Sequence, residues 1–130
     1  MWKWLAIGLL LLVSGCVESS TTPAEGMDVV KSYPAHNRPI RLVLGDLPPG
    51  TPYEVLGKVK AIEEYYDGSA AVETKIANDA RQIGADAIIK TKIWFSPRPL
   101  AWVAPHAEGL AVKLQQPDSL DFEKLPGSTR

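Results

Sequence analysis

Three features of the sequence predict an α+β domain in which a small sheet of about four strands carries one helix packed on one face. First, Val55 to Ala61 and Ala87 to Phe95 alternate in the way that half-buried strands do. Second, apolar residues recur at helical spacing between those two segments. Third, none of the 11 prolines lies between Tyr53 and Ser96, so this window can hold uninterrupted regular structure. The predicted order is strand, strand, helix, strand, strand.

Two strands are predicted before the helix. Ile40 to Leu44 forms the first, and the turn-forming run from Gly45 to Gly50 closes it. In the second strand we expect one face of the backbone to point into the core, namely Val55, Gly57, Val59 and Ala61. Lys58 and Lys60 then face the other way.

The helix is predicted between Ser69 and Gly84. Its apolar residues form one stripe, which consists of Val72, Ile76, Ala77, Ala80 and Ile83. Asp67-Gly68-Ser69 supplies a turn and an N-cap residue. Gly84 suits the left-handed position that ends many helices.

Two further strands are predicted after the helix. The first places one set of residues on a shared face opposite Lys90 and Lys92, namely Ala87, Ile89, Thr91, Ile93 and Phe95. In the second, Leu110, Val112 and Leu114 alternate with Ala111 and Lys113. The strands on either side of the helix suit a parallel arrangement through a right-handed crossover, and the strand order stays open.

The N-terminus has the pattern of a secretory signal. Lys3 is the only charged residue before Glu18, and a short apolar run follows it. As a helix, that run covers roughly 15 Å, about half of the hydrocarbon core of a bilayer. Val13-Ser14-Gly15-Cys16 resembles the lipobox of bacterial lipoproteins. The resemblance implies a signal peptide over residues 1–15 and a mature chain that begins at Cys16, with lipid on its sulfur and amino group. In enterobacterial lipoproteins, an Asp directly after the lipidated Cys resembles a signal for retention in the inner membrane. Val17 occupies that position here, so the resemblance favours the outer membrane, facing the periplasm.

The mature chain is expected to have three parts. Residues 16–39 are polar and interrupted by proline, which predicts a flexible tether with an end-to-end distance of about 25 Å. Residues 40–114 form the folded domain, and residues 115–130 form a flexible tail. The net charge of −1 argues against nucleic acid as a partner, and one Cys excludes an intramolecular disulfide.

Three segments of the domain resemble the YbjQ-like superfamily of small α+β domains. These are Tyr53 to Val59, Ala77 to Ile89 with its Gly-Ala-Asp-Ala-Ile-Ile run, and Ala107 to Val112. That superfamily is described in part as heavy-metal-binding and looks related to the RcsF envelope-stress lipoproteins. The resemblance implies a binding or sensing role in the cell envelope. RcsF-type sensors use paired cysteines in the folded domain, whereas no Cys follows Cys16 here.

Candidate chemistry is sparse, and we expect no catalytic site, cofactor or metal. His36 and His106 are the only histidines, and they are either exposed loop residues or, with Glu108, metal ligands. The acidic residues Glu63, Glu64 and Asp67 suit a solvated turn beside the helix N-terminus better than a cation site. Ser96 and His106 lie ten residues apart without a recognised nucleophile motif.

The segment from Trp94 to His106 is the candidate partner-contact loop. It combines Trp94, Arg98, Trp102 and His106 with three prolines. Trp and Arg are favoured interface anchors, and proline lowers the entropy lost on docking. The alternative is that the two tryptophans complete the core while the prolines protect its edge.

These features predict a lipid-anchored, non-catalytic binding or envelope-sensing module. Its expected partners are the membrane, through lipid on Cys16, and an envelope protein. The alternative is a periplasmic lipoprotein that binds a small ligand or a heavy metal.

Overall fold

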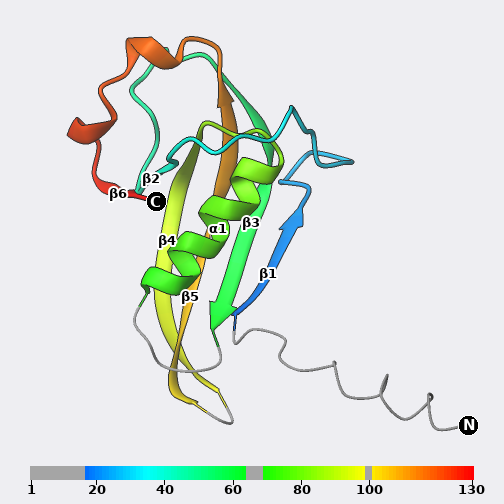
Figure 1. The fold of residues 1–130 in the computed structure, drawn as a ribbon, viewed down its shortest axis with the longest axis vertical. Helices are drawn as coiled ribbons and strands as arrows, with labels where there is room; N and C mark the ends of the chain where they lie inside the picture. The colour runs from blue at the N-terminus through cyan, green and yellow to red at the C-terminus, as the bar shows by residue number, and fades with distance from the viewer. Residues whose placement is uncertain (1–16, 64–68, 99–100) are drawn as a thin grey trace, which may run out of the picture.

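A computed structural model describes residues 17–63, 69–98 and 101–130 (Figure 1). Within these residues, six strands form one sheet and a single α-helix crosses one of its faces. The elements are β1 (Val17–Thr22), β2 (Arg41–Val43), β3 (Tyr53–Glu63), α1 (Ala70–Gln82), β4 (Ala87–Arg98), β5 (Ala101–Leu114), the 3-10 helices η1 (Pro117–Ser119) and η2 (Phe122–Lys124), and β6 (Gly127–Thr129). The predicted α+β class is confirmed, but the predicted number of strands is too small by two.

The strands lie in the order β1-β3-β5-β4-β2-β6. β5 is antiparallel to both β3 and β4, so β3 and β4 run parallel with β5 between them. β2 is parallel to β4, while β1 and β6 are antiparallel strands at the two edges. The edge strands explain the difference from the predicted order, because both form in segments expected to be flexible.

The segment from residue 17 to 39 is held against the domain and is not the expected flexible tether. β1 pairs with β3 from Val17 opposite Glu63 to Thr22 opposite Lys58. Farther along, the Lys31 amide donates to the Leu56 carbonyl at 2.9 Å. Residues 18–22 are exposed or partly exposed. Backbone hydrogen bonds therefore hold β1, and its sequence carries no apolar pattern that would predict it.

The segment from residue 115 to 130 is also ordered, in contrast to the expected tail. β6 pairs with β2 at the edge of the sheet. Glu73 on α1 accepts hydrogen bonds from the Ser128 hydroxyl at 2.8 Å and from Arg130 Nη2 at 3.3 Å. Three apolar residues of this segment pack over the sheet face opposite the helix, namely Leu120, Phe122 and Leu125.

α1 begins and ends close to the predicted positions. Ser69 occupies the predicted N-cap position, but its side chain makes no capping hydrogen bond to the backbone and instead donates to the Glu73 carboxylate at 3.0 Å. Gly84 follows the helix with a φ of +77°, as predicted. The predicted stripe packs into a core with the sheet, whose largest members are Ile40, Leu42, Leu56, Ile76 and Ile88. In the described part of the chain, no helix is both long and apolar enough to cross a membrane.

A β-bulge in β3 changes the predicted facing of its side chains. The register between β3 and β5 shifts between Val55 and Gly57, so Leu56 is the extra residue. Val55 consequently packs on the face away from the helix, whereas Val59 and Ala61 belong to the core beneath α1. The predicted shared face is wrong at Val55, because one inserted residue moves the rest of a strand to the other face.

A second bulge has the same effect in β4. The register between β4 and β5 shifts between Ile89 and Lys92, and Lys90 has a positive φ of 52°. Ala87 and Ile89 pack on the face away from the helix, whereas Ile93 packs on the helix side. The predicted shared face of β4 is therefore wrong, since strict alternation does not survive the bulge.

Candidate binding site

The sheet face opposite α1, called the back face below, is covered by protein at one end. There the C-terminal segment packs over Val112, Leu114 and Ile89. Toward the other end of β3, β5 and β4, the cross-strand positions of the back face carry charged and aromatic residues. A surface with this chemistry suits binding better than core packing.

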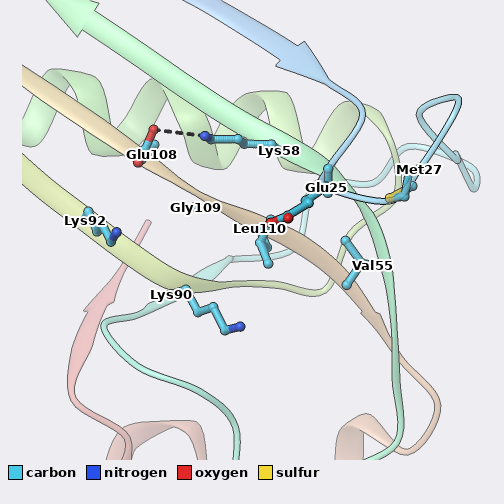
Figure 2. Close-up of a pocket in the computed structure, with 10 residues that line it drawn as sticks. Glu25, Met27, Val55, Lys58, Lys90, Lys92, Glu108, Gly109 and Leu110 are labelled. Atoms are coloured by element: carbon cyan, nitrogen blue, oxygen red, sulfur yellow. Dashed lines mark ion pairs between the residues drawn. The ribbon is translucent and has the colours of Figure 1, made fainter.

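The strand register places charged side chains in one row across the back face. Lys60 on β3 is opposite Glu108 on β5, which is opposite Lys92 on β4. Lys58 lies two residues before Lys60 and therefore points to the same face. Its Nζ is 3.4 Å from the Glu108 carboxylate (Figure 2). We call Lys58, Lys60, Lys92 and Glu108 the lysine row, and it carries more positive than negative charge.

A pocket of about 460 Å³ opens beside the lysine row (Figure 2). Val55 and Leu110 provide apolar lining, and Met27 lines it from the segment that follows β1. Lys90 and Lys92 contribute cationic groups from β4. The volume lies within the range of small-molecule pockets, about 300–1,000 Å³. Glu25 and Glu108 add carboxylates to the lining, so the pocket combines apolar contact with three lysine amines and two carboxylates.

The bulge in β4 positions the two cationic residues of that strand. The Lys90 amide donates to the Gly45 carbonyl at 2.8 Å instead of to β5. The Lys90 ammonium lies 3.7 Å from Asp46, and both side chains are more than half exposed. Among the described residues, Lys92 has no ion-pair partner. An incoming anion can therefore approach Lys92 without displacing an ion pair.

The next row contains two of the predicted site residues, Trp94 and His106, which are directly opposite each other. Their rings stack with centroids 4.9 Å apart and an angle of 15° between the ring planes. Lys60 Nζ lies 5.9 Å from the centre of the Trp94 ring. His106 is only 7% exposed. The interpretation of His106 as an exposed loop residue is therefore wrong, because the neighbouring strands enclose it.

Ser96 and His106, which the sequence separates by ten residues, are joined by a hydrogen bond between Ser96 Oγ and His106 Nε2. A hydroxyl bonded to an imidazole is the pair that nucleophilic catalysis uses. Here the Trp94 ring covers one face of the imidazole and the histidine is buried. We interpret the pair as a link between β4 and β5.

The predicted partner-contact loop is a β-hairpin. β4 and β5 remain paired as far as Arg98 opposite Ala101, whereas β3 ends at Glu63. The hairpin consequently extends past the end of β3 (Figure 1). We call this extension, Phe95–Arg98 with Ala101–Pro105, the arm. Phe95 is 46% exposed on it. Arg98 and Trp102 lie on the strands of the arm, and their side chains are outside the described part of the structure.

The two histidines lie apart and do not form the metal site that was considered. His36 Nε2 hydrogen-bonds to the Ala85 carbonyl at 2.6 Å, just beyond the end of α1, whereas His106 lies beside Trp94. Over residues 17–63, 69–98 and 101–130, no group of three His, Cys, Asp or Glu side chains is arranged to hold a metal ion. Glu63 is buried, so it does not belong to a solvated acidic turn.

Several predicted positions lie outside the described residues. They are the signal segment 1–15, the lipidation site Cys16, and Glu64 and Asp67 of the acidic cluster. No family model matches the chain, and no curated protein or solved structure matches it. The resemblance to bacterial lipoproteins and to the YbjQ-like superfamily therefore stays a prediction, and the geometry of the back face carries the functional interpretation.

Proposed function

We propose that the protein is a lipid-anchored, non-catalytic binding module of the cell envelope, and that its binding surface is the back face around the lysine row. The observation that carries this proposal is the group of lysines on the part of the back face that the C-terminal segment does not cover. Lys60 and Lys92 lie opposite Glu108 there, Lys58 pairs with its carboxylate, and Lys90 lines the adjoining pocket. The partner that fits this surface is an acidic segment of an envelope protein.

The existing ion pairs leave the lysines available to a partner. The Lys58 and Lys90 pairs are partly or largely exposed, and such pairs are worth only about 0–1 kcal/mol. Complementary charge also accelerates encounter and selects partners. The apolar lining at Val55 and Leu110 offers a place for one apolar side chain of the partner, next to the charges.

The sequence supports the membrane anchor. Its only Cys follows Val13-Ser14-Gly15, the position at which a lipoprotein is acylated. Two or more acyl chains at that residue hold a protein firmly, because each buried methylene contributes about 0.8 kcal/mol. The proposed location is the outer membrane, facing the periplasm, on the basis of Val17.

A small anionic ligand is the second candidate, and the pocket favours it specifically. An organic acid could place its apolar part on Leu110 and Val55 and its carboxylate near Lys92. This ligand would occupy about 460 Å³ instead of the whole lysine row. The size of the bound species therefore separates the two candidates.

The binding surface is tested by photocrosslinking from position 92 in producing cells, with position 75 as the matched control. Lys75 is a partly exposed lysine on α1, whose ion-pair partner is Asp79. We expect a discrete protein adduct from position 92 and none from position 75. Lys92→Glu should abolish partner capture from a neighbouring position such as 110, whereas Lys75→Glu should leave it unchanged. Equal capture by both variants would refute the surface.

A bound organic acid, found by native mass spectrometry in place of a protein adduct, would select the second candidate. The anchor has its own test, since Cys16→Ala should yield an unprocessed chain without lipid. An ester-hydrolysis screen tests the non-catalytic part. Turnover that disappears in Ser96→Ala would contradict it and make the Ser96–His106 pair an active site.

A further inference from the structure

We infer that the pocket beside the lysine row binds an amino acid or a short peptide with an apolar side chain, through both its ammonium and its carboxylate. This inference rests on the proposed binding role of the back face, and it names the ligand class that the second candidate leaves general. It follows from the charges that line the pocket, from the ion pairs that these charges make, and from the turn that holds one of them in place.

The first observation is that the pocket carries charges of both signs. Lys58, Lys90 and Lys92 line it together with the carboxylates of Glu25 and Glu108. A ligand that carries only an anionic group would meet repulsion from both carboxylates. A ligand that also carries an ammonium would turn one of these repulsive contacts into an attractive one. Such a mixture of charges therefore selects for a ligand of mixed charge and against a simple anion.

The second observation is that most of these charges already have partners. Lys58 pairs with Glu108 at 3.4 Å, and Lys90 pairs at 3.7 Å with a carboxylate outside the pocket lining. Across the described ranges of the chain, neither Lys92 nor Glu25 has an ion-pair partner. The two charges that remain for a ligand are thus one ammonium and one carboxylate. A zwitterion is the ligand that complements both.

The two available charges come from different elements and lie on different sides of the pocket. Lys92 projects from β4, whereas Glu25 belongs to the segment after β1. Figure 2 shows the Glu25 side chain pointing toward Leu110, with Lys92 on the other side of the pocket. A ligand with its ammonium near Glu25 and its carboxylate near Lys92 would place an apolar side chain against Leu110 and Val55.

The position of Glu25 is fixed by a turn that is held to the sheet on both sides. Gly26 has a φ of +82°, and the Met27 amide donates to the carbonyl of buried Ala24 at 3.0 Å, as in a type II turn. β1 pairs with β3 directly before the turn, and the amide of Lys31 donates to a β3 carbonyl after it. A carboxylate on a fixed backbone loses less entropy when a ligand binds.

Three probes that share one apolar side chain test the inference. Leucine has both charged groups, isocaproate lacks the ammonium, and isoamylamine lacks the carboxylate. Each is titrated into the isotope-labelled full chain in detergent micelles, and binding is followed by NMR through the amides of Gly109 and Met27. We expect leucine to bind more tightly than the other two probes. Alanyl-leucine, in which a peptide bond separates the two charged groups, then shows whether the site prefers a peptide or a free amino acid.

Two variants separate the two charged contacts. Glu25→Gln should weaken leucine binding about threefold, which is the scale of an exposed ion pair, and should not weaken isocaproate binding. Lys92→Gln should weaken the binding of leucine and of isocaproate by a similar factor. Lys75→Gln on α1 is the matched control and should change neither. Glu25 and Lys92 are both exposed, so the variants should keep the NMR spectrum of the folded chain.

Isocaproate binding as tight as that of leucine would overturn this inference alone, because the site would then take any organic acid. Leucine binding that Glu25→Gln leaves unchanged would overturn it as well. Isoamylamine binding as tight as that of leucine would overturn both this inference and the second candidate. A protein adduct from position 92 without binding of any probe would overturn this inference and leave the acidic segment as the partner. Neither an adduct nor probe binding would overturn the proposed surface itself.

Discussion

Gly84 offers a direct test of how the segment before β2 is fastened to the helix. Its φ is +77°, and a Cβ built on it would lie 2.7 Å from both Cβ and the carbonyl oxygen of Tyr33. The Tyr33 amide in turn donates to the Ile83 carbonyl at 2.9 Å. Gly84→Ala should therefore strain the backbone and also push this segment away from the end of α1.

The expected loss in the free energy of unfolding has two parts. An L-residue in the left-handed region costs about 1–2 kcal/mol. Overpacking in a tight site costs a further ~1–3 kcal/mol. We expect Gly84→Ala to lower the free energy of unfolding by about 3 kcal/mol in total. Two other glycines separate these parts. Gly50 has a φ of +83° with no atom near its Cβ position, and Gly45 has open space without a positive φ.

The assay is equilibrium unfolding in urea, followed by circular dichroism, on the soluble chain that begins at Val17. Gly45→Ala should change the free energy of unfolding by less than about 0.5 kcal/mol. Gly50→Ala should lose about 1–2 kcal/mol. Gly84→Ala should lose clearly more than Gly50→Ala. Equal losses at Gly84 and Gly50 would mean that the segment around Tyr33 is not packed against Gly84, which would refute the reasoning.

Three further predictions concern the charged and strained residues. Asp86, whose side chain is 9% exposed, pairs with two cations and accepts the Leu114 amide at 2.9 Å. Asp86→Asn should lower the free energy of unfolding, measured in urea, by about 1–3 kcal/mol. The control variant Asp121→Asn, at an exposed position, should lower it by less than about 0.5 kcal/mol. Lys90→Gly should leave the free energy of unfolding unchanged or raise it by up to about 1 kcal/mol, since glycine adopts the positive φ of the bulge without the strain of a Cβ. A clear loss of stability would contradict the bulge. A hydrogen bond to Glu54, and then its charge, raise the pKa of Tyr33 above 10.0. The stabilisation that the neutral Tyr33 hydroxyl gains from Glu54 is present below pH 10 and is lost as the pH rises through the raised pKa. Glu54→Gln should therefore lower the midpoint of the Tyr33 titration, followed by ultraviolet absorbance.

The central part of the fold could be predicted from the sequence because its signals are local. The helical stripe from Val72, the Ser69 cap and the Gly84 stop each depend on neighbouring residues. The two bulges could not be predicted in this way. An extra residue at Leu56 or Lys90 is decided by the partner strand β5, and periodicity within one strand carries no information about it.

The edge strands and the site were missed for related reasons. β1 contributes backbone hydrogen bonds and exposed polar side chains, so nothing in its composition distinguishes it from a linker. The arm was interpreted as a loop because of its prolines, although edge positions and hairpin ends tolerate them. A regular hairpin closed by Arg98 opposite Ala101 would place Trp94 opposite Pro105, and the register shift between Ser96 and Arg98 moves His106 opposite Trp94 instead, so this pair could not be predicted from symmetry alone. The lysine row needed the strand order, because β5 lies between Lys60 and Lys92.

The position of β6 has a consequence for the way in which the domain folds. Thr129 pairs with Arg41, a separation of 129 − 41 = 88 residues, whereas Arg98 pairs with Ala101, which is only three residues away in the sequence. Long loops lose more entropy on closure, so the hairpin and α1 should form early and the β2–β6 edge late. An intermediate without its edge strands would expose unpaired backbone on β2 and β3. Such an intermediate, more than the finished fold, is the species that we expect to self-associate during refolding.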